Sequence, residues 1–362
     1  MSSGAPNFNY STKLKDGTKI DFDVRKGAPS IKQEENGSYS IFNLNGATIT
    51  GAENGSNINI MGGKNVTFNG SGKGKDNVSL FNNVGTTVNG NDGNDRIKVI
   101  GGKDNTINGG NGNDKILNNS TGSVIDGGKG NDAIISKGNY NRIDGGEGND
   151  AIFSQGNRNK IEGGKGRDMI GSVGGQNRVD GGFGNDRIYS RGMNNNVKGG
   201  YGNDSMSIFG NNNRVDGGFG NDRIFSRGMN NNVYGGNGND RMSIFGNNNR
   251  VDGGWGNDRI GSFGFGNQNF GGPGFDNING FPDMGFGGGQ RPHGPHRNHG
   301  PHRNHGPHQI ELNQNGPLYS KENNKAFKNL PPQMPPMPDG QQMGPDMHRP
   351  HHRPHHPRGF FG

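Results

Sequence analysis

The chain has 362 residues, of which 73 are glycine and only 25% are apolar, so its average composition predicts too little apolar surface for an ordinary globular core. It has no cysteine, which excludes disulfides, thiolate metal sites and cysteine nucleophiles. The net charge of +7 comes from the flanks, because residues 101–280 hold 19 Lys and Arg against 18 Asp and Glu. That near balance argues against a phosphate-binding groove, and no specific nucleic-acid partner is expected.

The sequence predicts neither a membrane span nor a cleaved N-terminal signal. No run of about 18 apolar residues occurs, so no membrane span is expected. The first residues, MSSGAPNFNYSTKLKDGTKIDF, lack a charged start followed by an apolar stretch. A cleaved secretory signal peptide is therefore not expected.

Residues 1–50 do not share the repeats that follow. The segment from Lys19 to Val24 alternates polar and apolar residues, which predicts a strand. A stacked array leaves its first coil exposed unless something covers it. We therefore expect residues 1–50 to form an N-terminal β cap.

An aspartate recurs with a regular period over residues 51–280. The spacing is nineteen residues at first and then eighteen without a slip. An apolar residue follows the acid by two positions, and a second apolar series lies near the middle of each period. The acids are Asp76, Asp95, Asp114, Asp132, Asp150, Asp168, Asp186, Asp204, Asp222, Asp240, Asp258 and Asp276; the first apolar series runs from Ile116, Ile134 and Ile152 to Ile260 and Ile278, and the second from Ile107, Ile125 and Ile143 to Val233 and Val251.

This pattern predicts short strands and not helices. Glycine pairs recur in every period, and glycine within a helix costs about 1 kcal/mol relative to alanine. Two strands per period, each pointing its apolar residue inward, would bury two ladders of Ile, Val or Met between thin sheets. About twelve coils stacked at roughly 4.8 Å would make a rod of about 55–60 Å.

After residue 280 the composition changes to Gly, Pro, His and Met. All 11 histidines of the chain lie in this segment. We expect residues 281–362 to be a disordered tail, serving as a tether or binding transition metals weakly through imidazole.

The segments GGKGNDAII (127–135), GGEGNDAIF (145–153) and GGFGNDRIF (217–225) match the pattern G-G-x-G-x-D-x-U-x. On these residues the chain resembles the RTX family of haemolysin-type calcium-binding repeats, from about residue 70 to 280. The resemblance implies an all-β fold, a parallel β-roll or β-solenoid. It also implies Ca²⁺ held between the loops of successive coils by the aspartates from Asp95 to Asp276 and by glycine carbonyls. Those glycines are Gly127, Gly128 and Gly130, Gly145, Gly146 and Gly148, Gly181, Gly182 and Gly184, Gly199, Gly200 and Gly202, Gly217, Gly218 and Gly220, Gly235, Gly236 and Gly238, and Gly253, Gly254 and Gly256.

Half of each period departs from the family pattern. Nine residues after an acid the chain has an asparagine, which can form amide ladders and needs no ion. We therefore expect calcium along one edge of the roll, with weaker sites beside Arg167 and Phe275. The alternative is a stack of GND turns held by hydrogen bonds alone. The asparagines are Asn141, Asn159, Asn177, Asn195, Asn213, Asn231, Asn249 and Asn267.

The remaining features favour binding or structure over catalysis. Ser136, Ser154 and their equivalents are expected to point inward, and no base and nucleophile can be paired in the repeats. Arginines such as Arg187 and Arg223 lie near Tyr189 and similar rings. Such a face could contact a glycan, a cell surface or nucleic acid, but cross-strand Arg–aromatic packing is the commoner explanation. The irregular loop residues argue against ice binding. The resemblance implies an extracellular or cell-surface protein exported by a type I secretion apparatus, although the ending RGFFG is a poor likeness to its signal.

Overall fold

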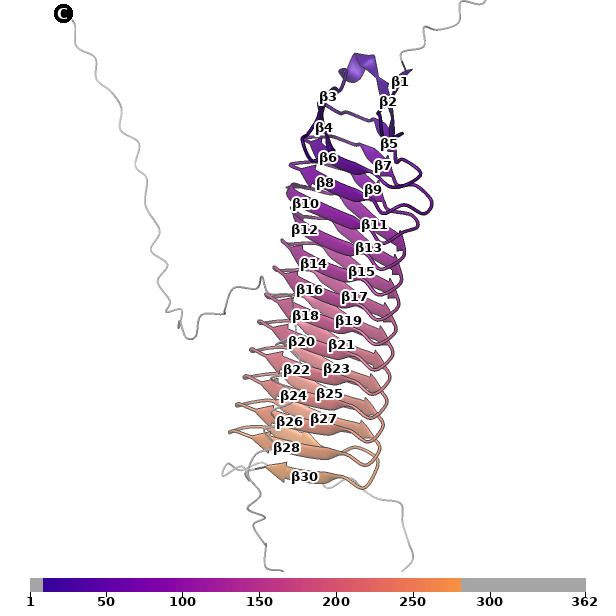
Figure 1. Cartoon of the computed structure of the whole chain (residues 1–362). Helices are drawn as coiled ribbons and strands as arrows, with labels where there is room; N and C mark the ends of the chain where they lie inside the picture. Colours follow the sequence, from indigo (N-terminus) through magenta and orange to yellow (C-terminus); the bar gives the residue numbers. More distant parts are fainter. Residues whose placement is uncertain (1–8, 281–362) are drawn as a thin grey trace, which may run out of the picture. The chain divides into compact units, whose positions relative to one another are not determined.

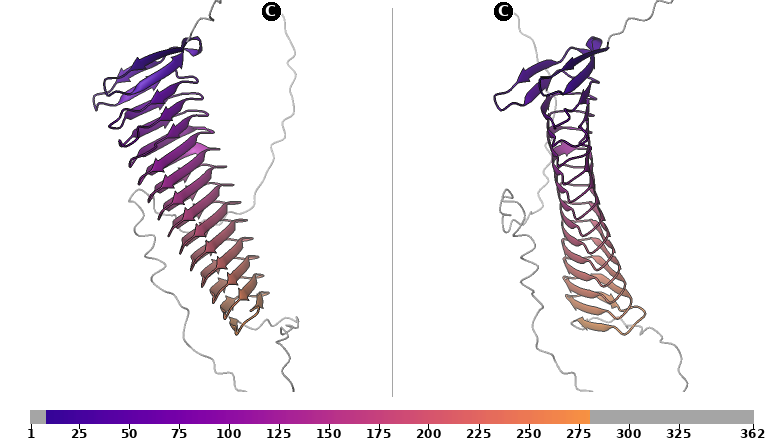
Figure 2. Two further views of the ribbon diagram at one scale, coloured as in Figure 1. Left: turned by 90° about the vertical axis from the view of Figure 1, so that its right-hand side faces the viewer. Right: turned by 45° about the vertical axis from the view of Figure 1, so that its right-hand side comes forward.

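The computed structural model describes residues 9–280, which form two 15-stranded sheets lying face to face (Figure 1). We call them sheet A and sheet B. Figure 2 shows from two further sides that the strands lie one above another in a narrow stack. The chain alternates between the sheets, so one strand from each makes one coil, and about 13 turns follow one another, close to the twelve expected.

Sheet A has its strands in the order β1-β2-β5 and then every odd-numbered strand to β29. Its strands are β1 (Asn9–Lys13), β2 (Lys19–Asp23), β5 (Thr48–Thr50), β7 (Thr67–Asn69), β9 (Thr87–Asn89), β11 (Thr106–Asn111), β13 (Val124–Lys129), β15 (Arg142–Glu147), β17 (Lys160–Lys165), β19 (Arg178–Phe183), β21 (Asn196–Tyr201), β23 (Arg214–Phe219), β25 (Asn232–Asn237), β27 (Arg250–Trp255) and β29 (Gln268–Phe270).

Sheet B starts with β3 and β4 and then takes every even-numbered strand. Its strands are β3 (Ser30–Gln33), β4 (Tyr39–Phe42), β6 (Asn57–Met61), β8 (Asn77–Phe81), β10 (Arg96–Lys103), β12 (Lys115–Thr121), β14 (Ala133–Lys137), β16 (Ala151–Gln155), β18 (Met169–Val173), β20 (Arg187–Arg191), β22 (Ser205–Phe209), β24 (Arg223–Arg227), β26 (Arg241–Phe245), β28 (Arg259–Phe263) and β30 (Asn277–Gly280).

The pairings at the N-terminal end are antiparallel, and β2 and β3 run against the direction of the later strands. β1 pairs with β2, β2 with β5, and β3 with β4, all antiparallel, and a short 3-10 turn (Val24–Lys26) joins the two sheets. From β4 and β5 onward every pairing is parallel. The N-terminal edge of both sheets is therefore occupied by an antiparallel strand.

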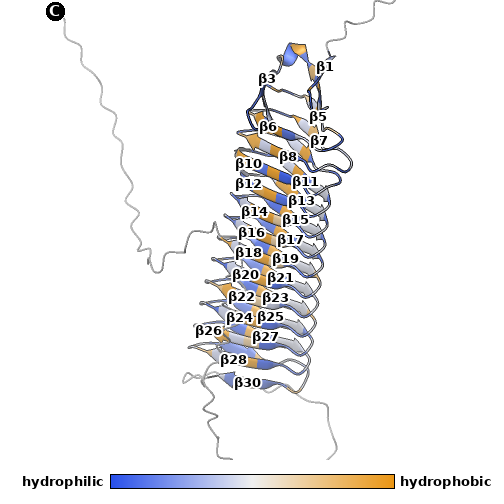
Figure 3. Cartoon of the chain, in the orientation of Figure 1, coloured by the Kyte–Doolittle hydropathy of each residue, from blue (hydrophilic) through white to orange (hydrophobic). Residues whose placement is uncertain are grey.

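Apolar side chains recur at the same place in successive strands (Figure 3) because the coils stack in register. Ile134 pairs with Ile152 and Ile143 with Ile161, and all four are buried between the sheets. Ser136 and Ser154 also point inward and are fully buried, as expected from the sequence. Each coil thus contributes only a thin layer of core.

The first two glycines of each motif lie within a strand and not in the loop that follows it. Gly127 and Gly128 are the fourth and fifth residues of β13, and only Gly130 lies in the loop that follows. Because glycine has no Cβ, the strand can continue up to the corner of the coil, where neighbouring coils approach too closely for a side chain.

Candidate metal centre

Each coil has two unlike corners. The loop from a strand of sheet A to the next strand of sheet B carries the aspartate, and we call it the acid corner; in one coil it lies between Lys129 and Ala133. The loop back to sheet A carries the asparagine, and we call it the amide corner. It lies between Lys137 and Arg142 in the same coil.

The aspartates of the acid corners form one continuous ladder inside the stack. Their side chains point into the coil and are almost fully buried, as Asp132 at 2% exposure shows. The Asp132 N–H donates to Oδ1 of Asp150 over 2.7 Å, and the Asp150 N–H donates to Oδ1 of Asp168 over 2.8 Å. The same bond joins each neighbouring pair from Asp76 to Asp276.

In ten of these residues, from Asp95 to Asp258, the second carboxylate oxygen is buried and has no hydrogen-bond partner. A buried charge without a partner is costly, so the ladder needs either protons or cations. Burial, with a smaller contribution from neighbouring carboxylates, raises the pKa of Asp186 to about 6 and of Asp222 to about 7. The residues with an unpaired Oδ2 are Asp95, Asp114, Asp132, Asp150, Asp168, Asp186, Asp204, Asp222, Asp240 and Asp258.

A backbone carbonyl lies beside each unpaired oxygen. A methyl group placed on Gly145 would lie 2.3 Å from the carbonyl oxygen of Gly163 and 2.6 Å from Oδ2 of Asp150. The two oxygens thus converge on one side of Gly145, which must lack a side chain. We call this space the cradle. The same geometry recurs at Gly109, Gly127, Gly163, Gly181, Gly199, Gly217 and Gly235.

The other two glycines of the motif are placed differently. Gly128 and Gly130 have φ angles of 101° and 124°, which only glycine adopts readily. Their carbonyl oxygens point along the stack: a methyl group on Gly146 would lie 2.0 Å from the Gly128 oxygen, and one on Gly148 would lie 1.8 Å from the Gly130 oxygen. The sequence predicted that the carbonyls of all three glycines bind calcium. In the structure, the carbonyl of the first glycine lies beside the carboxylate of the preceding coil.

The amide corner has the same ladder but supplies the missing donor. The Asn141 N–H donates to Oδ1 of Asn159 over 2.8 Å. Nδ2 of Asn159 then donates to the Gly138 carbonyl at 3.0 Å and to Oγ of Ser154 at 3.1 Å. Ser154 occupies the position that Gly145 has in the acid corner, nine residues earlier. At this corner a serine fills the cradle in most coils, and the amides bond without an ion except at Asn195 and Asn267, whose Nδ2 atoms have no hydrogen-bond partner.

The amide ladder differs in its bonding from the expected stack of amides bonded to one another. Each step runs from a backbone N–H to a side-chain oxygen one coil further on, as from Asn159 to Asn177 at 2.8 Å. In two coils the serine is replaced by buried Ile208 or Ile244, and the amide keeps its bond to a glycine carbonyl.

A third ladder, not predicted from the sequence, lies on the outside of the acid corner. The asparagine of each GND triplet accepts through Oδ1 from the N–H one coil further on, as Asn113 does from Asn131 at 2.6 Å. The Arg167 N–H donates to Oδ1 of Asn149, but the Arg167 side chain has no oxygen to accept from the next coil. The Phe275 N–H donates to Oδ1 of Asn257 and likewise ends the ladder there. The signal in the sequence was the repeated Asn before Asp.

Carboxylate and carbonyl oxygens are the donors that a hard cation such as Ca²⁺ prefers, and glycine leaves the space to reach them. Within residues 9–280 no three acidic, His or Cys side chains come together as a metal cluster. An ion at the acid corner would therefore take carboxylate oxygens from the ladder and its other ligands from backbone carbonyls. Like charges repeated at about 4.8 Å repel one another, and a cation between them removes that repulsion.

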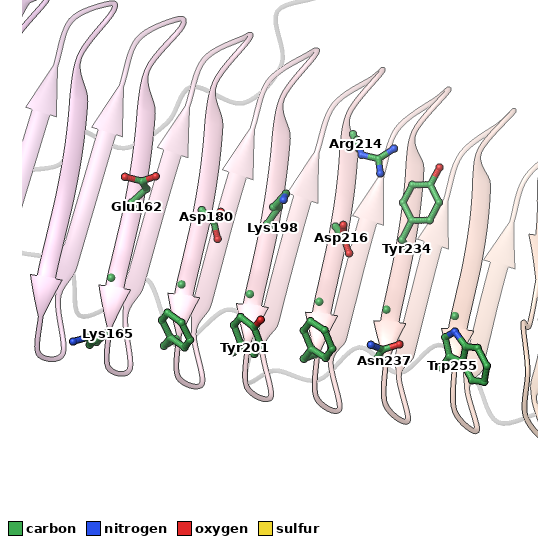
Figure 4. A pocket seen from close by; sticks show the side chains of 18 of the residues that line it. Glu162, Lys165, Asp180, Lys198, Tyr201, Arg214, Asp216, Tyr234, Asn237 and Trp255 are labelled. Carbon is green, nitrogen blue, oxygen red and sulfur yellow. The ribbon is translucent and has the colours of Figure 1, made fainter.

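A groove of about 1100 Å³ runs along the outer face of sheet A from β15 to β27. Glycines such as Gly182 form its floor, and Phe183, Tyr201 and Phe219 stack along one wall with ring centroids 4.9 and 4.8 Å apart. Acidic and basic side chains are mixed along the other wall, so the groove has no uniform charge. Figure 4 shows this second row, with Glu162, Asp180, Lys198, Asp216 and Tyr234.

Comparison with known proteins agrees with this geometry. The family model of the RTX calcium-binding nonapeptide repeat matches residues 101–120, 138–170, 173–206, 189–224, 207–242 and 227–260. No similar protein was found among curated proteins or solved structures. In the part of the chain that the structure describes, no helix is long and apolar enough to cross a membrane. The chain therefore carries RTX calcium-binding repeats, folded as a parallel β-solenoid, across residues 101–260.

Proposed function

We propose that the acid corners bind a row of Ca²⁺ ions and that the array folds when they bind. The observation that carries the proposal is the contrast between corners: Asn159 finds donors and acceptors for its whole amide, whereas Oδ2 of Asp150 faces the Gly163 carbonyl with no donor between them. An ion shared between successive aspartates would satisfy both oxygens. The repeat family, which binds calcium, supports the choice of metal.

Because the core is thin, we expect folding to depend on ion binding. Two regular apolar side chains per coil leave the stack dependent on its corners, and ligands that bind only the folded state stabilise it by mass action. We propose that the chain stays unfolded where calcium is scarce and folds outside the cell or at its surface. Export by a type I secretion apparatus fits such a chain, since it would be threaded while unfolded.

Some expectations stay predictions. They include the division into a cap over 1–50, a roll over 51–280 and a tail over 281–362. The weak binding of transition metals by the histidines falls on residues outside the described part. The rival account is an adhesive β-solenoid that needs no ion, and a β-type circular dichroism spectrum that resists chelators would favour it.

The number of bound ions tests the one-edged arrangement. The ten acids with an unpaired Oδ2 leave nine spaces between neighbours. With one ion in each space, we expect about nine Ca²⁺ per chain by mass spectrometry under non-denaturing conditions. Asp204→Asn should remove up to two ions, because that carboxylate borders two sites. Asp216→Asn, on the outer face of sheet A, is the matched control and should remove none. About eighteen ions would mean that both corners bind calcium.

A further inference from the structure

One outer face of the solenoid is uniformly basic although the repeats are nearly neutral. We call it the basic face: the outward side of β20, β22, β24, β26 and β28 in sheet B. These five strands contain no Asp or Glu. Their arginines are all exposed. They are Arg187, Arg191, Arg223, Arg227, Arg241 and Arg259.

The opposite face of the same coils is mixed. On sheet A, β19 carries Arg178 with Asp180, β23 carries Arg214 with Asp216, and β27 carries Arg250 with Asp252. The aspartates of the adjoining acid corners are buried and do not reach the surface. The near-neutral composition therefore conceals a separation of charge between the two faces.

The arginines of the basic face stand in register along the stack. Arg223 pairs directly with Arg241 across neighbouring strands, and Arg241 pairs with Arg259. Like charges directly opposite one another across strands are destabilising. Three cations in line at about 4.8 Å, on a face without a carboxylate, form a linear site for repeated negative charges.

A ridge of aromatic rings lies between the arginines. The rings come from Tyr189, Phe209, Phe225, Phe245 and Phe263, and successive centroids lie 5.4, 5.6, 5.5 and 5.1 Å apart. Three of the four ring pairs are tilted by 39–46° and one is stacked. The strand register also places Arg227 between Phe209 and Phe245, as cross-strand Arg–aromatic packing requires.

We propose that the basic face binds a linear anionic polysaccharide that bears sulfate or carboxylate groups. Guanidinium groups bind such groups through two parallel hydrogen bonds. The cations lie on four of the five strands, since β22 has none, and they do not converge on one point, which suits an extended polymer more than a small anion. The proposal is independent of calcium binding except that both need the folded solenoid.

Nucleic acid fits the same face less well. Proteins that bind single strands offer aromatic faces on which bases stack. The ridge rings contact one another and, apart from Phe263, are half-buried, so little of each ring face is open to a base. Duplex binding would need cations spaced to follow a groove, and these lie in straight rows on a sheet.

Biolayer interferometry of the full chain with 1 mM Ca²⁺ tests the proposal. Dextran sulfate and hyaluronan are the anionic probes, neutral dextran is the matched uncharged polymer, and single-stranded poly(dT) represents nucleic acid. The variant Arg223→Gln/Arg227→Gln/Arg241→Gln removes three charges from the basic face. Lys129→Gln/Arg178→Gln/Lys198→Gln removes three from sheet A. Circular dichroism confirms that both variants fold.

We expect the chain to bind an anionic polysaccharide and not dextran. The basic-face variant should bind at least tenfold more weakly, whereas the sheet A variant should change less than twofold. Equal losses in the two variants would show that net charge alone attracts the polymer and would overturn the proposal. Tighter binding to poly(dT) than to either polysaccharide would overturn it in favour of nucleic acid.

Discussion

Gly199→Ala is expected to destabilise the solenoid and to reduce the number of calcium ions it binds. The new methyl group would lie 2.3 Å from the Gly217 carbonyl oxygen and 2.4 Å from Oδ2 of Asp204, where no Cβ fits. The backbone of Gly199 is outside the left-handed region, so the effect comes from filling the cradle. Overpacking of this kind costs about 1–3 kcal/mol. Chemical denaturation in saturating calcium measures it.

Gly261→Ala is the matched control for that substitution. Its methyl group would meet nothing closer than 3.5 Å, and its backbone is also outside the left-handed region. We expect a stability change within about 0.5 kcal/mol and an unchanged ion count. If the Gly199→Ala variant were less stable but still bound as many ions as the unmodified chain, the cradle would have a packing role only.

Acid is expected to replace calcium in folding the solenoid. The ordinary pKa of these carboxyl groups is 3.8, and burial raises it to about 6 in Asp186 and about 7 in Asp222. The folded state therefore holds protons more tightly than the unfolded state. Without calcium, this contribution to stability is complete below about pH 4 and is lost as the pH rises through about 6 to 7. A protonated Oδ2 can donate, as Nδ2 does at the amide corner.

Circular dichroism of calcium-depleted protein at several pH values checks this. We expect a β spectrum at pH 5, its loss by pH 8, and its return at pH 8 when calcium is added. Glu147 has a lowered pKa because it bonds to Lys165, so it acts in the opposite direction, but the pair is exposed and its effect is small. Equal folding at pH 5 and pH 8 without calcium would contradict control by the aspartate ladder.

The repeat period was enough to predict the fold. Because one residue type occupies one position in each coil, the inward places of Ile188 and Val197 followed from spacing alone, and both are buried. The same argument predicted the buried serines. The repeat period could not predict the antiparallel pairing at the N-terminus, because β1 and β3 belong to no repeat and their direction depends on tertiary pairing.

The candidate site was predicted in its residues but not in its bonding. Spacing identified the aspartates and glycines, yet it did not show that Oδ1 of Asp150 is used within the ladder and that Oδ2 is left for an ion or a proton. Nor did it show that Ser154 and Gly145 occupy equivalent positions, where the serine fills the amide corner and the glycine leaves the acid corner open. These depend on which way each side chain turns, which a periodic pattern leaves open.

The most direct test of the account is a calcium titration of the full, calcium-depleted chain at pH 8, followed by far-ultraviolet circular dichroism. At that pH carboxyl groups with a pKa of about 6 to 7 are ionised, so the folded ladder holds unpaired buried charges unless a cation binds them. We expect a cooperative change from an unfolded to a β spectrum as calcium is added, and no such change with Mg²⁺, which demands a more rigid octahedral site. A β spectrum already present before calcium, unchanged up to millimolar concentrations, would contradict the account.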